Sequence, residues 1–294
     1  MSRRPRLQFA GAVYHVMARG NRKSTIFHDD EDRRQFLQIL GAAAALYDLL
    51  IRAMCLMGNH YHLVLETPAC NLSDGMHFIN GVFAQRSNRR HRQTGHVFEG
   101  PFRSLVIQRE SYLMRAARYV VRNPVRAGLV AHASDWPWSS YRATVGLEPA
   151  PSWLHVDWIR GAFNAPSLAE ARQRYVSYVN ASAESQRRIA LNAVVLGTKQ
   201  FGKRLLEVLG TDQPDSPAPS VVRTLSRPTL SELFDGDGVQ ASGASRDRLI
   251  QRACVEHGYR FADIARFLGI DRSTASKAAN RCQRTRADRD MQSI

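Results

Sequence analysis

The segment LLIRAMCLMGNHYHLVLETP, residues 49–68, is a long run of apolar and β-branched residues that ends at Pro68. Such a run predicts a strand in the core of a sheet. Two histidines, His60 and His62, interrupt it and flank Tyr61. Because side chains alternate along a strand, we expect both histidines on one face and Tyr61 on the other.

Helical and strand-like patterns alternate on both sides of this segment. Strand-like alternation covers residues 10–20 and 96–108. Helical spacing covers residues 29–48, 71–95 and 109–123, and Pro124 begins a further short helix. The order strand, helix, strand, helix, strand, helix predicts an α+β domain with a small antiparallel sheet over residues 1–150.

The remainder of the chain has an all-helical pattern. We predict a helical extension over residues 151–210, a Pro- and Ser-rich linker over 211–244 and a DNA-binding domain over 245–294. In that domain Ala265 and Gly269 are four residues apart, which is typical of a helix-turn-helix, although an ordinary helical hairpin fits too. Its second helix would present four candidate DNA contacts: Arg272, Ser273, Thr274 and Lys277.

The charge of the chain indicates an anionic partner. Lysine and arginine number 41 against 26 acidic residues, a formal net charge of +15. This excess favours nucleic acid over a membrane, since no basic amphipathic anchor and no apolar run of membrane-spanning length occurs. The N-terminus lacks a signal-peptide pattern, so we expect a cytoplasmic protein. Four widely spaced cysteines (Cys55, Cys70, Cys254 and Cys282) argue for reduced thiols and against a zinc site or a disulfide framework.

The histidine pair has two interpretations. Two imidazoles on one strand face can share a metal ion, or they are partly exposed histidines on the solvent side. Gly58 comes just before them. If it lies within the strand, its missing side chain would let a ligand or another backbone approach closely. Further along, Tyr119 and Asn123 are four residues apart and share a helix face.

Three motifs together resemble a known family. GNHYHLVLE (58–66), YVVRNPVRAGLV (119–130) and DWPWSSY (135–141) occur in the order and spacing of the single-tyrosine HUH transposases, the insertion-sequence-200-like enzymes and their REP-associated relatives. HUH denotes His, hydrophobic residue, His. The resemblance covers about residues 8–145, and it implies a ferredoxin-like or RRM-like HUH fold.

The resemblance also implies a chemistry. Such enzymes act on single-stranded DNA beside hairpins, and some assemble as dimers. Carried over to this sequence, Tyr119 would be the nucleophile, and His60, His62 and Asn123 would hold Mg²⁺ or Mn²⁺. Asn123 has a competing role, because Asn followed by Pro124 suits the start of a helix. Tyr119 also has a competing role, as a tyrosine packed in the hydrophobic core.

Arginines are the candidate DNA contacts of this domain. One group lies at the end of the 71–95 helix and after it: Arg86, Arg89, Arg90 and Arg92. A second group surrounds the candidate nucleophile in sequence: Arg103, Arg118 and Arg122. Solvated helix faces are the alternative interpretation. His15 is predicted to be an ordinary surface or core residue, and Asp135–Tyr141 a structural turn.

Three functions are compatible with these features. The first is a metal-dependent endonuclease and strand transferase that forms a 5′-phosphotyrosine through Tyr119. The second is a non-catalytic DNA-binding regulator that retains the transposase fold and binds duplex DNA through its C-terminal domain. The third is a metal-dependent hydrolase that uses water as the nucleophile.

Overall fold

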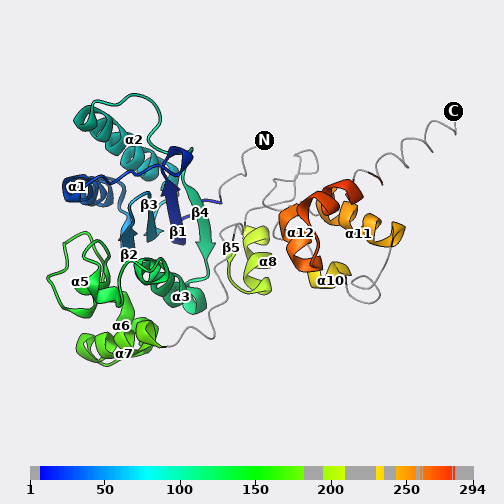
Figure 1. Cartoon of the computed structure of the whole chain (residues 1–294). Coiled ribbons are helices and arrows are strands. Elements are labelled where there is room, and N and C mark those ends of the chain that lie inside the picture. The colour runs from blue at the N-terminus through cyan, green and yellow to red at the C-terminus, as the bar shows by residue number, and fades with distance from the viewer. Residues whose placement is uncertain are drawn as a thin grey trace. The chain divides into compact units, whose positions relative to one another are not determined.

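The computed structural model describes residues 7–181, 195–208, 230–234, 243–255, 259, 261–279 and 281. The chain forms two compact units, Arg6–Phe201 and Gly202–Ile294, which are described separately (Figure 1). The first unit is the larger and contains a β-sheet; the second is helical where it is described. The break between the units therefore lies beyond residue 150, where the sequence pattern suggested the end of the first domain.

The first unit is built on one five-stranded sheet. Its strands are β1 (Ala12–Arg19), β2 (Leu50–Leu56), β3 (His60–Thr67), β4 (Arg103–Ile107) and β5 (Val195–Leu196). They lie in the order β2-β3-β1-β4-β5. The first four pair antiparallel, and β5 pairs parallel to β4. The predicted α+β class is confirmed, but the sheet is mixed because β5 lies in a segment predicted to be helical.

Residues 49–68 form a hairpin, so the prediction of a single long strand is wrong. β2 and β3 pair with each other, and the Met57 amide donates to the carbonyl of His60 at the turn, 2.8 Å away. Gly58 lies in this turn and not inside a strand. Its carbonyl accepts the amides of Ile26, at 2.9 Å, and Phe27, at 3.1 Å. The close backbone approach expected at Gly58 therefore comes from the loop after β1.

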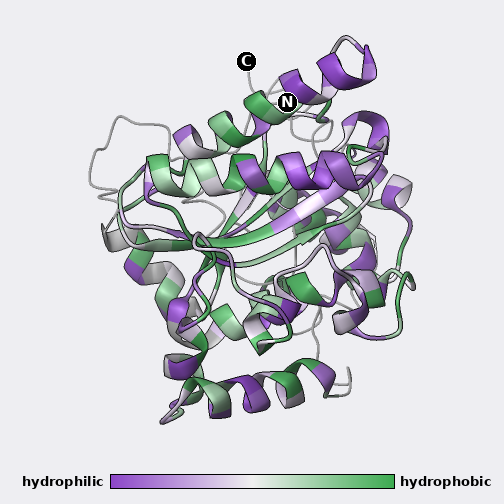
Figure 2. Cartoon of the chain, turned by 90° about the vertical axis from the view of Figure 1, so that its left-hand side faces the viewer, coloured by the Kyte–Doolittle hydropathy of each residue, from purple (hydrophilic) through white to green (hydrophobic). Residues whose placement is uncertain are grey.

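Helices cover both faces of the sheet (Figure 2). On one face lie α1 (Asp30–Tyr47) and α2 (Leu72–His91); on the other lies α3 (Arg109–Val121), followed by α4 (Asn123–Arg126). α1 begins where the Asp29 carboxylate accepts the amides of Glu31 and Asp32, which satisfies two of the free donors of the first turn.

Tyr61 projects to the α1/α2 face, as the strand alternation predicts. Its ring packs 4.7 Å from that of Phe36, and Phe36 packs 5.3 Å from Phe83, so strand and both helices meet in one aromatic cluster. All three side chains are buried.

Shorter elements complete the first unit: the 3₁₀ turns η1 (Asn21–Lys23) and η2 (Ala133–Asp135), and the helices α5 (Tyr141–Val145), α6 (Trp158–Phe163) and α7 (Leu168–Asn180). Helix α8 (Lys199–Val208) begins in this unit, and the boundary between the units falls within it. The DWPWSSY segment covers the outer edge of β2. The Trp136 indole donates to the Leu56 carbonyl at 3.0 Å, and the Ser140 amide donates to the Met54 carbonyl at 2.9 Å. This pairing confirms the predicted structural turn.

The second unit has its own apolar core. Its described helices are α10 (Leu230–Phe234), α11 (Ala244–Val255), α12 (Phe261–Leu268) and residues 272–279. They enclose Phe234, Ile250 and Ile264, all completely buried. α10 lies within the segment predicted to be a linker. Gly269, at φ +65°, makes the turn between α12 and residues 272–279, so two helices flank a short turn where the sequence placed them. Cys282 lies outside the described residues.

No described helix combines the length and apolarity needed to cross a bilayer. The described cysteines, Cys55, Cys70 and Cys254, are all free thiols. Cys55 is buried, and burial raises the pKa of its thiol well above the ordinary value. Cys70, in contrast, is exposed.

Candidate active site

The two histidines of β3 lie on the sheet face that α3 covers. β3 is an inner strand, held between β1 and β2, so the backbone that carries the histidines is paired on both sides. His60 and His62 are two residues apart, and their ring centroids are 5.1 Å apart. His62 is 1% exposed, whereas His60 is partly exposed at the end of the strand. The pair is thus open to solvent on the His60 side.

Tyr119 reaches this face from α3. The helix packs on the sheet through Leu113, Ala116, Ala117 and Val120, a stripe at helical spacing in which the alanines permit a close approach. Tyr119 lies beside that stripe and is partly buried. Its ring centroid is 5.7 Å from that of His62, edge to face. The structure therefore brings the three residues singled out from the sequence into one cluster.

His15 is a fourth member that the sequence interpretation missed. It lies on β1, where Met17 opposes His62 and His15 opposes Val64, so His15 is the diagonal neighbour of His62 on the same face. Its Nε2 lies 2.9 Å from Nδ1 of His62, and its ring is 5.6 Å from that of Tyr119. A single polar residue in the otherwise apolar stretch AVYHVMA was the available signal.

The burial of these histidines keeps them neutral near pH 7. Desolvation lowers the pKa of His15 to about 4. It also lowers the pKa of His60 to about 4, with a contribution from the nearby positive charge of Arg19. Desolvation lowers the pKa of His62 well below 6.5, with contributions from the other two histidines and from arginines. Neutral imidazoles have a free lone pair, which is the form that ligates metals.

The donor set fits a cation with few protein ligands. Both histidines of β3 have Nδ1 within hydrogen-bond distance of another side chain, His60 with Asn59 and His62 with His15. Among the described residues, no group of three or more His, Cys, Asp or Glu side chains is arranged to hold a metal ion. A cation here would therefore take two imidazole nitrogens and complete its shell with other oxygens.

Asn123 lies one helical turn after Tyr119, but its side chain caps a helix. The amide nitrogen Nδ2 donates to the Tyr119 carbonyl at 3.2 Å, at the C-terminal end of α3. It makes no capping bond to the start of α4, which was the competing prediction. Its bond to α3 leaves the Oδ1 oxygen as the atom that could face a cation. Its role as a ligand remains a prediction.

Arg126 contacts the candidate nucleophile directly. Its guanidinium lies 4.4 Å from the centroid of the Tyr119 ring, a cation–π contact between α4 and α3. This contact places a positive charge beside the tyrosine and restricts the motion of its ring.

The part of the chain that contains this cluster is similar to known proteins. Residues 8–123 match the family model described as transposase IS200 like. This part of the chain is similar to the IS200-like transposase family. The predicted resemblance is thereby confirmed for this part of the chain, which contains both histidines, Tyr119 and Asn123.

Two individual proteins are also similar to part of this chain. A Haemophilus influenzae protein assigned to the REP-associated tyrosine transposases is 25% identical over 118 residues, which cover 36% of this chain. The match spans 64% of the length of that relative. A solved structure of a REP-associated tyrosine transposase bound to a REP hairpin aligns with 53% of this chain and 94% of its own, at 20% identity and a TM-score of 0.44.

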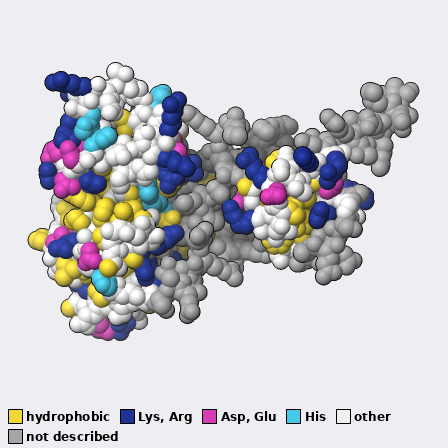
Figure 3. Space-filling view, viewed as in Figure 1, with side chains coloured by type: hydrophobic (Ala, Val, Ile, Leu, Met, Phe, Trp, Pro, Cys, Tyr) yellow, Lys and Arg dark blue, Asp and Glu magenta, His cyan; other side chains and the backbone are white. Residues whose placement is uncertain are grey.

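The arginines at the end of α2 differ in their surroundings. Arg86, Arg89 and Arg92 are exposed and form no ion pair within the described parts of the chain. Figure 3 shows Lys and Arg side chains spread over the surface of the first unit, with Asp, Glu and His side chains among them. Arg90 instead pairs with Asp29 and with the buried Asp32, both at 2.6 Å, which ties α2 to the start of α1. Arg90 therefore connects the two helices in addition to contributing positive charge to the surface.

Two predicted DNA contacts near Tyr119 have other partners. Arg118 is buried, stacks 4.9 Å from the Tyr178 ring and donates to the Ala181 carbonyl. Arg122 donates to the Val179 carbonyl at 2.8 Å. Both guanidinium groups thus hold the C-terminal end of α7, whose free carbonyls attract positive charge. The structure thus gives both residues a structural role, and their binding of DNA stays a prediction.

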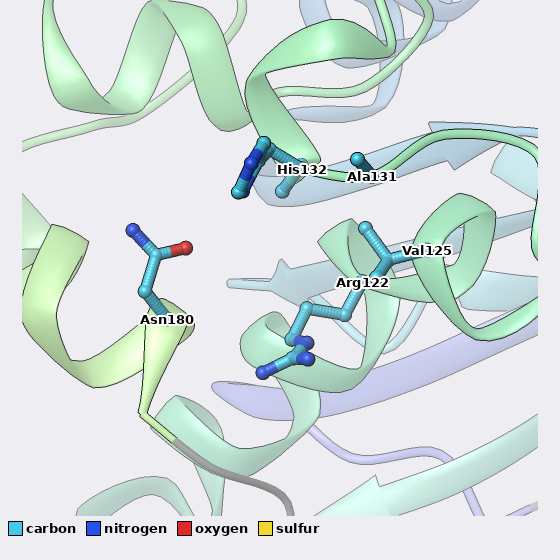
Figure 4. Close-up of a pocket in the computed structure, with 6 residues that line it drawn as sticks. Arg122, Val125, Ala131, His132 and Asn180 are labelled. Atoms are coloured by element: carbon cyan, nitrogen blue, oxygen red, sulfur yellow. The ribbon is translucent and has the colours of Figure 1, made fainter.

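A small cavity lies beside Arg122. It measures about 350 Å³, and Val125, His132 and Asn180 contribute to its lining (Figure 4).

The remaining predicted DNA contact of the first unit is Arg103. It is exposed and pairs with Glu99 at 3.0 Å, four residues earlier in the chain.

The predicted contacts of the second unit are all at the surface. Arg272, Ser273, Thr274 and Lys277 are exposed on the helical residues 272–279, while Ala275, Ala278 and Ala279 of the same stretch are buried in the core. The helix is thus amphipathic, with its small residues inward and its hydrogen-bonding residues outward. The role of these four residues in DNA binding stays a prediction.

Proposed function

We propose that this chain is a single-stranded DNA endonuclease and strand transferase that cuts beside a hairpin through Tyr119, with Mg²⁺ or Mn²⁺ held by His60 and His62. The family match supports a transposase-like DNA-processing role. The observation that carries the finer proposal is the proximity of the Tyr119 ring to His62, 5.7 Å between centroids. Nucleophile and cation ligands must lie this close to act on one phosphate.

The reaction transfers a phosphoryl group to tyrosine. The phenolic oxygen of Tyr119 forms a bond to phosphorus, the bond from phosphorus to the 3′ oxygen breaks, and that oxygen takes up a proton while the phenol loses one. The products are a 5′-phosphotyrosine and a free 3′-hydroxyl. Because the covalent bond conserves the energy of the phosphodiester, another 3′-hydroxyl can displace Tyr119 and rejoin the strand.

The residues around Tyr119 have separate roles in this step. His60 and His62 would hold the cation, which would supply Lewis-acid stabilisation of the charge on the phosphate and on the departing oxygen. His60 and His62 present neutral nitrogens, α3 fixes the position of Tyr119, and the Arg126 contact orients its ring. Exposed Arg86, Arg89 and Arg92 would bind phosphates of the DNA.

The test is the formation of a covalent adduct. The full chain is incubated with labelled single-stranded hairpin DNAs and Mn²⁺ or Mg²⁺, and the products are separated on denaturing gels. We expect a protein–DNA band that requires the metal and is absent with Tyr119→Phe. Tyr112→Phe is the matched control, since Tyr112 lies two turns earlier on the same helix and should leave the adduct unchanged.

The second candidate function is a non-catalytic DNA-binding regulator. The exposed polar face of residues 272–279 favours it, because these residues belong to the second unit and the histidine site belongs to the first. This function predicts binding of duplex DNA by the C-terminal unit and no adduct with any hairpin. A water-dependent hydrolase would instead retain cleavage in Tyr119→Phe. Dimer formation also remains a proposal, which sedimentation of the full chain would test.

A further inference from the structure

Each histidine of β3 has its Nδ1 atom engaged by a residue that is not itself a candidate ligand. Asn59 engages His60, and His15 engages His62. A neutral imidazole carries its proton on only one nitrogen, so the partner of one nitrogen decides which form the other takes. These outer partners therefore determine whether Nε2 can bind a cation. This inference rests on the function proposed above.

The tautomer of His60 follows from the hydrogen bonds of Asn59. The Asn59 amide nitrogen Nδ2 lies 3.0 Å from the Lys23 carbonyl. A carbonyl can only accept, so the NH₂ group faces Lys23 and the Oδ1 oxygen faces His60. Oδ1 also can only accept, and it lies 2.7 Å from Nδ1 of His60. His60 Nδ1 must therefore carry the proton, which leaves the lone pair on Nε2.

The hairpin holds Asn59 in this position. The Gly20 amide donates to the Asn59 carbonyl at 2.9 Å, and the neighbouring Gly58 carbonyl accepts the amides of Ile26 and Phe27. The loop after β1 thus fixes both the backbone and the side chain of Asn59. At Gly20 this loop also passes close to itself, where an added Cβ would lie 2.0 Å from the Ser24 carbonyl oxygen, so only glycine fits.

The tautomer of His62 depends on His15. Two arrangements satisfy the 2.9 Å bond between His15 Nε2 and His62 Nδ1. If His15 donates, His62 carries its proton on Nε2 and cannot ligate through that atom. If His62 donates, its Nε2 lone pair is free and His15 carries its own proton on Nδ1. That Nδ1 atom is buried and has no hydrogen-bond partner in the described structure in either arrangement, so a cation at Nε2 of His62 is what selects the second.

We propose that Asn59 and His15 are positioning residues: Asn59 holds His60 as the Nδ1–H tautomer, and His15 accepts from Nδ1–H of His62 when a cation binds, so that both Nε2 atoms are presented to one divalent cation. Neither residue touches the cation. Residues that orient metal-ligating histidines in this way influence affinity about 10- to 100-fold in known sites. If Asn59 only shaped the turn and His15 only filled the core, their substitution would change stability without changing cation binding selectively.

Paired substitutions separate these roles. Asn59→Ala removes the acceptor, whereas Asn59→Asp retains an oxygen in the same position. His15→Phe removes the acceptor from a ring of similar shape, whereas His15→Gln can still accept. Mn²⁺ affinity of the full chain is measured by calorimetry at pH 7.5, and thermal unfolding is followed for every variant.

We expect the Ala and Phe variants to bind Mn²⁺ about 10-fold or more weakly and the Asp and Gln variants to stay within about threefold of wild type. Wild-type affinity in the Ala and Phe variants would overturn the inference, as would equal losses within each pair. Failure of the wild-type chain to bind Mn²⁺ would overturn the proposed metal site and this inference with it.

The tautomers can also be read directly in the metal-free protein. Protein labelled with ¹⁵N in histidine gives imidazole NMR signals that distinguish Nδ1–H from Nε2–H, and His60→Gln and His62→Gln assign them. We expect His60 as Nδ1–H in wild type and a mixture in Asn59→Ala. We expect His62 to become Nδ1–H when Zn²⁺ or Mg²⁺, which do not broaden the signals, is added. His60 as Nε2–H would overturn the inference.

Discussion

The two faces of the sheet receive alternate side chains of the same strand and use them differently. On the α1/α2 face, Tyr61 joins Phe36 and Phe83 in a cluster that is fully buried and apolar except for one hydroxyl. On the α3 face, His60 and His62 join His15 and Tyr119 in a cluster of polar rings. One face stabilises the fold, and the other retains buried polar groups at a cost to stability.

The largest expected effect is a loss of stability on the α1/α2 face of the sheet. Phe36→Ala should reduce the free energy of unfolding by about 3–5 kcal/mol, because it leaves a cavity between α1, α2 and β3. Denaturant unfolding measures it. Adduct formation per folded molecule should be unchanged, because Phe36 lies across the sheet from Tyr119. A matching loss of adduct in the folded fraction would contradict the separation of the two faces.

The pH dependence of stability should reveal the buried neutral histidine on the α3 face. Burial lowers the pKa of His15 from 6.5 to about 4. Between these values the unfolded chain binds a proton that the folded chain does not, so stability falls as the pH falls from 6.5 toward 4. His15→Phe should lose less stability across that window than wild type. Parallel curves for the two proteins, measured by denaturant unfolding at several pH values, would speak against a buried neutral His15.

A smaller effect compares one hydroxyl on each face. Tyr61→Phe removes a 2.6 Å bond to Asn80 and should reduce the free energy of unfolding by about 1 kcal/mol. Tyr119→Phe removes a hydroxyl that has no hydrogen bond within the described structure and should change stability by less than about 0.5 kcal/mol. Thermal unfolding of both variants measures the difference. Equal destabilisation would mean that Tyr119 is a core residue.

The smallest expected effect distinguishes arginines that bind DNA from arginines that bind protein. Arg89→Ala should weaken binding of single-stranded DNA and reduce the slope of log affinity against log salt by about 0.7. Arg122→Ala should leave that slope unchanged and destabilise the end of α7 instead, because Arg122 donates to the Val179 carbonyl. Titrations at several salt concentrations test both. A reduced slope for Arg122→Ala would show that Arg122 contacts DNA as well.

The sequence predicted those parts of the fold that local patterns determine. α1 has its acidic cap and α3 its apolar stripe, so both were placed within a few residues. The hairpin between β2 and β3 was missed because its turn has only Gly58 and Asn59 to mark it within an apolar run. β5 was missed because a two-residue strand is defined by its pairing with β4, which is a tertiary contact.

In the candidate site, too, some residues could be predicted from the sequence and others could not. His60, His62 and Tyr119 were found because their motif spacing is visible in the sequence. His15 was missed because only the register of β1 against β3 brings it to His62. The contacts of Arg118 and Arg122 with the end of α7 were missed because those partners lie about 60 residues later in the chain. Charge alone does not reveal which anion or carbonyl a guanidinium will contact.

The most direct test of the account identifies the atom that bonds to DNA. Adduct formed with a hairpin oligonucleotide and Mn²⁺ is digested with nuclease and trypsin, and the modified peptide is sequenced by mass spectrometry. Since trypsin cleaves after Arg118 and Arg122, the account predicts a nucleotide on the tyrosine of the peptide YVVR, residues 119–122. A nucleotide on any other tyrosine, or cleavage of the DNA with no modified peptide, would contradict it.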